Sequence, residues 1–363
     1  MYEPKLRYIF CPMRDRSLWI QTSLIKYLNS FGVKPYLVFP RPEDVLHVGI
    51  INSMLTKSGV LFEDGRNIVR EEHPDYDVMF SESSGFSSLF EKRHLTESKR
   101  KNKVNIKLNI SISINRGMTN PNYTPDETKN TLHGIYMKGQ RTLNHFKTFT
   151  IVLFFIIAGD PDWDVFHTSE FKTMVQQTKE KYGEKFLLIG MIFSGPKQEI
   201  VWCKRIIQRA LAMGITPVVR VHSYRERFIP DFLRPYVDSE TPRFVLFAAA
   251  SHVVENIGST MIAECLYLNR KVGMTGLMPH FGGYGEGHIW FENSNEWKII
   301  ALPRIGKELL DIVPRVVSVQ EIDKFLSDDI VSYDEKMIDT IFGWQRVPSY
   351  CSDLFEKIEK KLI

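Results

Sequence analysis

Residues 185–193 read Lys-Phe-Leu-Leu-Ile-Gly-Met-Ile-Phe, and this nearly continuous apolar run constrains the fold more than any other segment. Such a run is typical of a strand that is buried on both faces of a parallel sheet. A helical pattern follows over residues 198–213 and ends at Gly214, and two more strands are predicted over 216–221 and 243–249. Because strands and helices alternate, we predict an α/β unit with a parallel sheet.

The first half of the chain shows the same alternation. A strand is predicted over residues 7–13, a helix over 17–31 with Ser17 as its N-cap and Gly32 as its stop, and a second strand over 35–39. Together they make a βαβ start, so a second α/β unit is expected. The 363 residues are 43% hydrophobic and 25% charged, which fits a globular chain long enough for two cores.

A Gly-Ser-Thr turn separates a strand from a helix within residues 251–274. Gly258 permits a tight turn, Ser259 and Thr260 can cap the helix, and the N–H groups of its first turn point at any anion bound there. Glu264 lies one helical turn after Thr260 on the same face, where it can accept hydrogen bonds from ribose or sugar hydroxyls. The segment predicts a site for an activated phosphate, and an ordinary capped βα turn is the alternative.

Cationic and hydrogen-bonding side chains gather at the end of the strand predicted over 216–221. Arg220 lies near its end, and His222 and Arg225 follow it. Ligands of open α/β sheets bind outside the carboxyl ends of the strands, so these side chains are predicted to stabilise a leaving diphosphate. The turn of Ser194 and Gly195 follows the preceding strand and is expected to join the donor site. For His222, a capping or packing role is the alternative.

This pattern resembles the C-terminal half of GT-B glycosyltransferases and is most similar to the CDP-glycerol glycerophosphotransferase-like proteins. Those proteins carry a strand ending in a basic residue, then His-Pro, and later an Asp/Asn-Ser-Ser segment followed by a glutamate. The matching stretches here are 220–223 and 256–260. Ser223 replaces the family's proline, and Asn256 stands near where an aspartate is common. The resemblance covers residues 185–363 and is specific to an architecture more than to a substrate.

The resemblance implies two Rossmann-like α/β domains facing each other across a cleft. Residues 1–160 would bind the acceptor, residues 161–335 the nucleotide-activated donor, and a helical tail over 336–363 would cross back to the first domain. It implies transfer of a glycosyl or polyol-phosphate group to a hydroxyl acceptor in surface glycan or glycolipid biosynthesis. The donor is a substrate, so no separate cofactor is expected. No metal is expected either, because helix dipoles and basic side chains can neutralise the leaving diphosphate.

The acceptor side departs from this family. A loop over residues 115–125 stands where the family carries His-Gly, with the histidine as the expected base, but here the pair is Arg116 and Gly117. Arginine stays protonated at pH 7 and cannot take the acceptor's proton. His133 or Asp126 is then the base, or the acceptor chemistry differs from that of the family.

The glycine-richest stretch of the chain, residues 279–288, carries His280 and His288. We predict that it closes on the ligand as a lid, since glycines allow the backbone to move and approach closely. A surface turn without a role in binding is the alternative.

Charge is divided unevenly along the chain. The first 150 residues carry 22 lysines and arginines against 15 acids, and the remainder carry 25 against 28. The densest basic run, Lys99 to Lys103, with Lys107 after it, would attract anionic lipid headgroups or a phosphorylated polymer, and the first of these predicts peripheral contact with an anionic membrane. A solvated helix end is the alternative. Nucleic acid is not expected as a partner, because the run lacks interleaved aromatic residues.

Asp160, Asp162 and Asp164 alternate in a way that invites a metal interpretation. The EF-hand pattern fails, since its glycine and glutamate positions hold Val165 and Phe171. We interpret the cluster as a domain junction. The four cysteines are scattered, no signal-peptide pattern opens the chain, and no apolar run reaches the roughly 20 residues of a membrane span. A cytoplasmic location, with contact at the inner membrane face, is expected.

Two other function classes stay open. A non-hydrolysing UDP-sugar 2-epimerase shares the two-domain form, but it needs catalytic acids and a histidine and takes no second acceptor. A non-catalytic protein that binds a sugar nucleotide or a glycan would show affinity without turnover.

Overall fold

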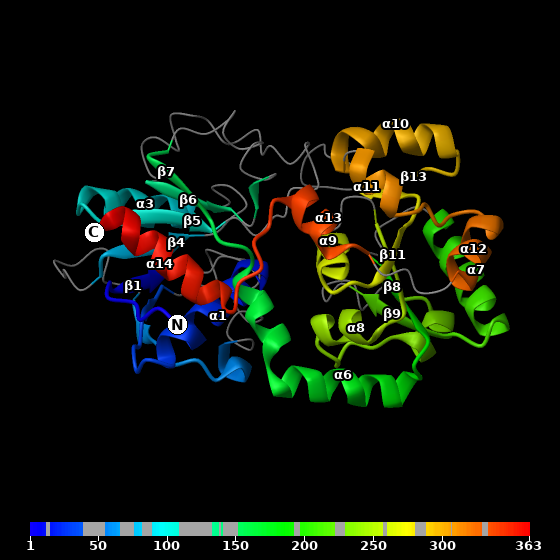
Figure 1. Cartoon of the computed structure of the whole chain (residues 1–363), viewed down its shortest axis with the longest axis horizontal. Helices are drawn as coiled ribbons and strands as arrows, with labels where there is room; N and C mark the ends of the chain where they lie inside the picture. Colours follow the sequence, from blue (N-terminus) through cyan, green and yellow to red (C-terminus); the bar gives the residue numbers. More distant parts are fainter. Residues whose placement is uncertain are drawn as a thin grey trace. The chain divides into compact units, whose positions relative to one another are not determined.

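A computed structural model describes residues 1–11, 15–38, 55–65, 76–81, 89–108, 133–137, 139–140, 152–191, 197–221, 229–256, 260–279, 288–305, 307–328 and 333–363. The chain forms two compact units, each with its own parallel sheet (Figure 1). The N-terminal unit contains the described residues up to Phe166 together with Phe342–Ile363. The C-terminal unit contains those from His167 to Ile341.

The N-terminal unit is centred on a seven-stranded parallel sheet with the order β3-β2-β1-β4-β5-β6-β7. Its strands are β1 (Tyr8–Phe10), β2 (Tyr36–Leu37), β3 (Glu63–Asp64), β4 (Val78–Ser81), β5 (Val104–Leu108), β6 (Gly134–Met137) and β7 (Phe154–Ile157). Strands β2 and β3 lie on one side of β1, and strands β4 to β7 lie on the other side. The sheet is therefore doubly wound, with its direction reversing between β1 and β4.

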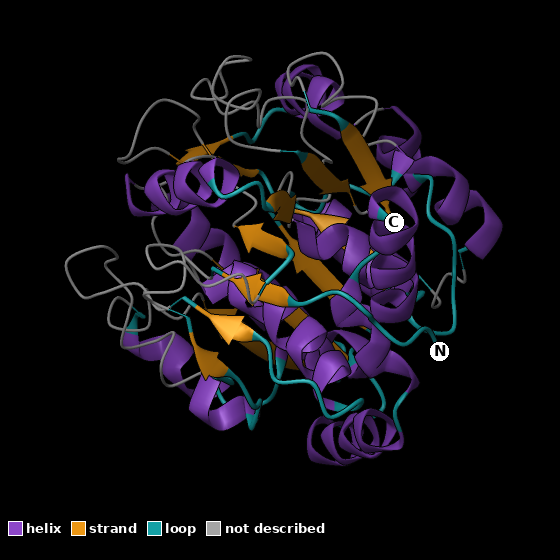
Figure 2. Cartoon of the chain, turned by 90° about the vertical axis from the view of Figure 1, so that its left-hand side faces the viewer, coloured by secondary structure: helices purple, strands orange, loops and turns teal. Residues whose placement is uncertain are grey.

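Helices cover both faces of this sheet (Figure 2). They are α1 (Asp15–Asn29), α3 (Leu89–Arg100), the 3-10 helix η1 (Pro161–His167) and α14 (Tyr350–Leu362). Leu24 of α1 and Phe355 of α14 share a buried core with Phe80 on one face. On the other face, Asn105 Nδ2 of β5 donates a hydrogen bond to the Leu95 carbonyl of α3.

Two expectations from the sequence need correction here, the start of the first helix and the exposure of Lys107. Helix α1 begins at Asp15, so Ser17 lies inside the helix and is not its N-cap. The helix dipole favours an acidic residue such as Asp15 in the first turn, and Asp15 and Ser17 are both residue types that favour the start of a helix. Lys107 of the basic stretch is fully buried in β5, not on the surface.

The last helix is fixed to the start of the chain through one buried carboxylate. Glu359 of α14 accepts hydrogen bonds from the hydroxyls of Tyr2 and Tyr8, at 2.6 and 2.7 Å, and from the N–H groups of Lys5 and Leu6, at 2.8 and 3.0 Å. The hydrogen bond to Glu359, together with burial, raises the pKa of Tyr2 to about 12. Burial and the same carboxylate raise the pKa of Tyr8 further, so both phenols remain proton donors at neutral pH.

The aspartate cluster around η1 holds the N-terminus of α14. Asp164 accepts hydrogen bonds from Ser349 Oγ at 2.9 Å and from the N–H groups of Tyr350 and Cys351 at 2.5 and 3.0 Å. These N–H groups lie at the positive end of the helix dipole, where a carboxylate is stabilising. Asp164, which belongs to the aspartate cluster that invited a metal interpretation, thus acts as a cap of α14.

Aromatic side chains also pack against each other where η1 meets the start of α14. Trp163 of η1 packs edge-on against Trp344 and Tyr350, with ring centroids 4.8 and 5.7 Å apart. We call the residues Trp163, Asp164, Trp344 and Tyr350 the η1 clasp. The chain leaves the N-terminal unit after Phe166 and returns to it at Phe342, so both connections between the units begin next to this clasp.

The C-terminal unit is built on a four-stranded parallel sheet with the order β11-β10-β8-β9. Its strands are β8 (Phe186–Met191), β9 (Thr216–Val221), β10 (His252–Glu255) and β11 (Lys271–Met274). The predicted strand over 216–221 is confirmed, and the apolar run over 185–193 contains β8. A separate antiparallel ribbon pairs β12 (Leu277–Pro279) with β13 (His288–Trp290).

The described helices of this unit are α6 (Ser169–Tyr182), α7 (Lys197–Ala212), η3 (Asp231–Tyr236), α8 (Arg243–Ala249), α9 (Thr260–Tyr267), α10 (Ser294–Ile305), α11 (Lys307–Ile312), α12 (Val319–Ser327) and α13 (Glu335–Phe342). Helix α7 ends where predicted, because Gly214 takes a φ of +69° that favours glycine. Trp202 of α7 and Phe325 of α12 share a buried core with Ile189 and Val254 of the sheet.

The strand predicted over 243–249 is wrong, because these residues form helix α8. Residues 245–249 are all buried, and an apolar run that is buried all round has the same pattern in a helix and in a parallel strand. The three alanines at 248–250 favour the helix. The strand of this region is the shorter β10, which starts at His252.

His252 makes the C-terminal unit sensitive to acid. Its side chain is buried, with Nδ1 2.9 Å from Ser251 Oγ and its ring against Phe325. Burial, and then the charges of Lys271 and Lys185, lower the pKa of His252 to about 4. The folded protein therefore keeps this imidazole neutral at pH values where an exposed histidine takes up a proton.

Because the pKa of His252 lies near 4 in the folded chain and near 6.5 when unfolded, the unfolded state binds more protons between these values. Stability is expected to be level above about pH 6.5 and to fall below it, by about 2 kcal/mol between pH 7 and pH 5. Urea midpoints at the two pH values measure this. His252→Gln should remove the loss, whereas the same substitution at exposed His167 should not; an unchanged pH profile in His252→Gln would contradict the assignment.

Candidate functional site

The C-terminal sheet has a topological switch point between β8 and β10. The chain passes from β8 through α7 to β9 on one side, and then crosses to β10 on the other side of β8. In an open α/β sheet the loops after the two strands at such a point diverge and leave a crevice at the carboxyl edge. This edge is the candidate site.

Most of the predicted donor and catalytic residues follow the carboxyl ends of these strands in the sequence. Ser194 and Gly195 come after β8, His222 and Arg225 after β9, and Gly258 and Ser259 after β10. All six lie outside the described residues. Their assignment to the site therefore rests on the strands they follow and stays a prediction.

Thr260 and Glu264 lie on α9, which begins at Thr260 directly after the Gly-Ser pair. The Glu264 side chain is only 3% exposed, and its Oε1 lies 3.6 Å from Arg243 Nη2 at the start of α8. This ion pair can stabilise the packing of α8 against α9, and its carboxylate can also bind a ligand.

Glu255 is a second buried acid at this edge, and sequence reasoning did not single it out. It is the last residue of β10 and is 2% exposed. Its neighbour Asn256 accepts a hydrogen bond from Thr275 Oγ1 at 3.0 Å, which ties the ends of β10 and β11 together. The signal in the sequence was a charged residue at the end of the apolar strand His-Val-Val-Glu.

The two acids lie near one buried thiol. Burial raises the pKa of Cys265 in α9 well above its ordinary value, and the charges of Glu255 and Glu264 raise it further. Cys265 is fully buried and carries no disulfide. The carboxyl edge at β10 and α9 is therefore an acidic environment to which Arg243 contributes positive charge.

Arg220 holds the chain that follows β9. Its Nη1 donates to the carbonyls of Asp238 and Thr241, at 2.7 and 3.2 Å. The Asp238 carboxylate in turn accepts from Tyr182 Oη at 2.6 Å and from Lys181 Nζ at 3.4 Å. Burial opposes ionisation of Asp238, but these bonds and those from Thr241 outweigh it and keep the pKa of Asp238 below its usual range. Arg220 is thus placed to position the segment 238–241.

On the acceptor side, Arg116, Gly117 and Asp126 lie outside the described residues. His133 directly precedes β6, and its Nδ1 accepts the N–H of Asn105 at 3.1 Å. It therefore lies at the amino edge of the N-terminal sheet, whereas ligands bind at the carboxyl edge. Burial and the charge of Lys99 lower its pKa. The interpretation of His133 as the base for the acceptor is not supported by this position.

The predicted lid joins two paired strands. Pro279 and His288 are register partners in the β12–β13 ribbon, and residues 280–287, including His280, lie outside the described residues. The stretch is thus the connection of a hairpin. Whether it covers a ligand stays a prediction.

The basic run Lys99 to Lys103 ends α3 and the turn after it, with Arg100 in an ion pair with Glu97 at 2.6 Å. Asn102 takes a φ of +58° in this turn. These positions agree with a solvated helix end and leave the membrane contact a prediction. In the part of the chain that the structure describes, no helix is long and apolar enough to cross a bilayer.

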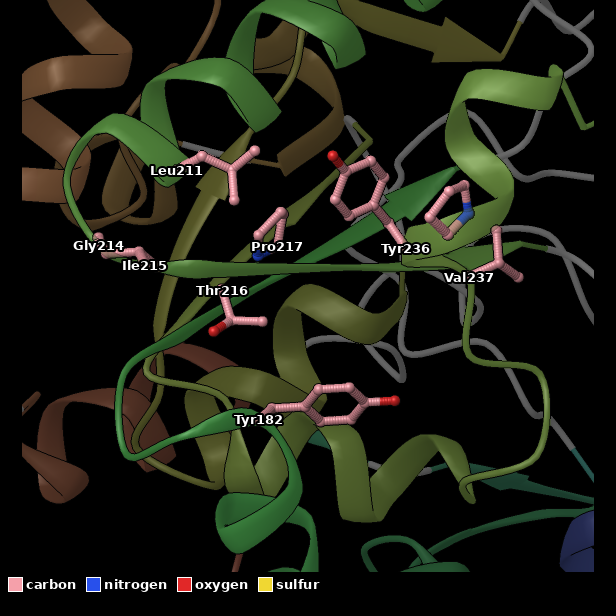
Figure 3. Close-up of a pocket in the computed structure, with 9 residues that line it drawn as sticks. Tyr182, Leu211, Gly214, Ile215, Thr216, Pro217, Tyr236 and Val237 are labelled. Carbon is pink, nitrogen blue, oxygen red and sulfur yellow. The ribbon is translucent and has the colours of Figure 1, made fainter.

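A surface pocket of about 450 Å³ lies at the opposite edge of the C-terminal sheet (Figure 3). It surrounds the amino end of β9 at Thr216 and Pro217 and is walled by Tyr182 and Tyr236. Because ligands of this fold bind at the carboxyl edge, we do not assign the donor to it. Across the described ranges, no group of three or more His, Cys, Asp or Glu side chains is arranged to hold a metal ion.

The two doubly wound sheets define the class of fold. Comparison with solved structures finds GT-B glycosyltransferases and UDP-N-acetylglucosamine 2-epimerases along nearly the whole chain. The predicted fold class, α/β with two Rossmann-like domains of the GT-B type, is confirmed. A scan against protein-family models and a search of curated proteins found no match.

Among individual structures, the chain is similar to Arabidopsis thaliana UGT89C1 complexed with UDP-L-rhamnose, with a TM-score of 0.58, 10% identity and 99% of each chain covered. It is similar to the Neisseria meningitidis UDP-GlcNAc 2-epimerase bound to UDP-GlcNAc, with a TM-score of 0.56, 12% identity and 98% of each chain covered. A glycotransferase of kitacinnamycin gives 0.54 at 11% identity, covering 98% of this chain and 99% of the other. At such identities the likeness establishes the fold alone.

Proposed function

We propose that the chain binds a nucleotide-activated donor on its C-terminal unit and transfers a glycosyl or polyol-phosphate group to a hydroxyl of an acceptor held by the N-terminal unit. The observation that carries the proposal is the switch point between β8 and β10, where β10 leads through Gly258, Ser259 and Thr260 into α9. The nucleotide sugars bound by structures of the same fold support a donor of this kind.

In this proposal the donor's diphosphate lies at the N-terminus of α9, where the N–H groups of the first turn and the helix dipole favour an anion. Glu264 accepts hydrogen bonds from donor hydroxyls, and His222 and Arg225 supply positive charge for the leaving group. Arg220 positions the segment that leads into α8 through its bonds to the carbonyls of Asp238 and Thr241.

The two transfer reactions differ in the bond that breaks. In glycosyl transfer the acceptor oxygen bonds to the anomeric carbon, the bond from that carbon to phosphate breaks, and a nucleoside diphosphate leaves. In polyol-phosphate transfer the acceptor oxygen bonds to the distal phosphorus, and a nucleoside monophosphate leaves. In both, the acceptor's proton passes to a base, for which Asp126 is the sequence candidate left after His133. The nucleotide product therefore identifies the reaction.

We also propose surface glycan or glycolipid biosynthesis as the setting. A lipid-linked acceptor would bring the protein to an anionic membrane face, and the basic run Lys99 to Lys103 is the surface we expect to meet it.

A UDP-sugar 2-epimerase is the second candidate. It is favoured by a TM-score of 0.56 to the Neisseria meningitidis epimerase, close to the value for the plant glycosyltransferase. The acids Glu255 and Glu264 near one thiol also fit a reaction that needs carboxylates. An epimerase would change the sugar of its nucleotide substrate with no acceptor present.

The test is a thermal-shift screen against CDP, CMP, UDP, GDP and ADP, with and without Mg²⁺. A ligand that binds only the folded protein at a hundred times its Kd stabilises it by about 2.7 kcal/mol, so one nucleotide is expected to raise the melting temperature by several degrees without metal. Replacing Ser259 and Thr260 together by alanine should remove the shift.

The matched control is Ser318→Ala, which removes the capping box of α12 in the same unit. It should lower the melting temperature and leave the nucleotide shift intact, because α12 is not at the switch point. No shift with any nucleotide would contradict the proposal. Binding without turnover, with any donor and acceptor pair, would identify a binding protein in place of a transferase.

A further inference from the structure

The pocket at the amino edge of the C-terminal sheet lies where three helices end. Helix α6 ends at Tyr182, α7 at Ala212 and η3 at Tyr236. Tyr182 and Tyr236 line the pocket, and so does Leu211 in the last turn of α7 (Figure 3). The last carbonyl groups of a helix carry partial negative charge. The pocket therefore disfavours a phosphate or another anion, in contrast to the start of α9 at the carboxyl edge.

The charges beside the pocket count against a cation as well. The described residues that line it are all uncharged. Next to Tyr182, the buried carboxylate of Asp238 already accepts hydrogen bonds from Tyr182 and Thr241. Lys181 Nζ lies 4.7 Å from the centroid of the Tyr182 ring, so a positive charge is already present beside the pocket and repels a second one. A ligand that fits this setting is uncharged.

The lining combines flat apolar surfaces with hydroxyl groups. The rings of the two tyrosines and of Pro217 and Pro235 supply the apolar surfaces. Thr216 is exposed, and Figure 3 shows the Tyr236 hydroxyl directed towards Pro217. A sugar ring has matching properties, because its C–H groups form apolar faces and hydroxyls surround its edge. The face of an aromatic ring carries partial negative charge and attracts such C–H groups.

The pocket also has the size and the order of a binding site. Its volume of about 450 Å³ lies within the roughly 300–1,000 Å³ of typical small-molecule pockets. The Tyr182 hydroxyl donates to Asp238 at 2.6 Å, and the Phe186 ring packs against Tyr182 with the centroids 5.4 Å apart. These contacts hold one wall in place before any ligand arrives, which lowers the entropy that binding costs.

We propose that this pocket binds an uncharged sugar residue of a glycan, with the sugar ring against Tyr236 and Pro217 and its hydroxyls bonded to Tyr236 and Thr216. The inference goes beyond the proposed function, because it needs neither a donor nor a nucleotide. Strand β9 runs for six residues from Thr216 to Val221, roughly 17–20 Å, towards the carboxyl edge where we propose the reaction. The bound sugar therefore belongs to a part of the glycan remote from the reacting group.

The test is a titration, followed by nuclear magnetic resonance, with neutral tetrasaccharides of glucose, galactose, mannose and N-acetylglucosamine and with no nucleotide present. At least one of them is expected to bind the parent protein. Tyr236→Phe keeps the ring and removes the hydroxyl, so it should weaken binding about two- to tenfold, the range of one neutral hydrogen bond. Thr216→Ala should have an effect of similar size, and Tyr236→Ala should remove measurable binding.

Phe232→Ala is the matched control. Phe232 lies on the same short helix, is 37% exposed and is not part of the pocket lining. Its replacement should leave the affinity for the sugar unchanged within about twofold, the lower limit of a hydrogen bond's effect. Because Tyr236 packs against the buried core of this unit, melting temperatures are measured for every variant, and Tyr236→Phe, which keeps that packing, decides the result if Tyr236→Ala does not fold.

Two results would overturn the proposal. One is that no tetrasaccharide binds, and the other is that binding is equal in the parent protein and in the Tyr236 and Thr216 variants. Spermidine and cyclohexanol, a cation and an apolar ring, are titrated in parallel; if either binds more tightly than every sugar and depends on Tyr236, the pocket is not a sugar site. A nucleotide-induced thermal shift without sugar binding contradicts this inference alone, whereas sugar binding without any nucleotide shift contradicts the proposed function alone.

Discussion

Glutamine in place of Glu264 is expected to weaken donor binding by about ten- to a hundredfold, since it removes the charge that strengthens hydrogen bonds to donor hydroxyls. The substitution keeps the shape of the side chain within the packed α8–α9 contact. Isothermal titration with the nucleotide identified by the thermal screen measures the effect.

The control for this prediction is Arg243→Gln, which breaks the same ion pair from its other side. Arg243→Gln should lose the more stability, because it removes a positive charge beside the Glu264 carboxylate, which is 3% exposed, whereas Glu264→Gln leaves a guanidinium that is 29% exposed to water. Only the Glu264 variant should lose affinity by more than about threefold. Equal losses of affinity in the two variants would make the ion pair structural and would remove Glu264 from the donor site.

Alanine in place of Glu359 is expected to destabilise the protein by about 3–5 kcal/mol. Four donors, the hydroxyls of Tyr2 and Tyr8 and the N–H groups of Lys5 and Leu6, would lose the buried carboxylate that is their shared acceptor. That loss is a large part of the roughly 5–15 kcal/mol that stabilises a typical domain. Urea unfolding, followed by far-UV circular dichroism, measures it.

Glu356 on the same helix provides a matched comparison. It pairs with Lys360 at 2.6 Å, and both side chains are exposed. Exposed pairs contribute little, so Glu356→Ala should shift the urea midpoint far less than Glu359→Ala does. If the two alanine variants unfolded at the same urea concentration, the anchoring role of Glu359 would be wrong.

Strands were predicted correctly where the short apolar run and the turn residues on either side of it both indicated a strand. The run before residue 193 and the run over 216–221 are short, rich in branched apolar residues and bounded by turn residues, and they contain β8 and β9. The run over 243–249 has the same apolar character, but it packs as helix α8. Burial on all sides removes the periodicity that distinguishes the two, so this error could not be avoided from the pattern alone.

The sequence indicates where the candidate site lies, and this location stays a prediction, but the contacts of its described residues could not be predicted. The Gly-Ser-Thr segment and the basic residues after β9 pointed to the carboxyl edge, because in parallel sheets that edge collects the loops. Two of its features depend on cross-strand register, which a single sequence does not disclose. One is the placement of Glu255 over Gly190, and the other is the use of Arg220 to hold the carbonyls of Asp238 and Thr241.

The position of α14 has a consequence for folding during synthesis. Its Phe355 packs against Tyr8 and Tyr27 in the core of the N-terminal unit, yet it is translated after the whole of the C-terminal unit. Domains usually fold in the order in which they leave the ribosome. The N-terminal unit emerges first, but it cannot complete its core until α14 has been translated. The C-terminal unit is translated between the two parts of the N-terminal unit, so it can reach its native state first.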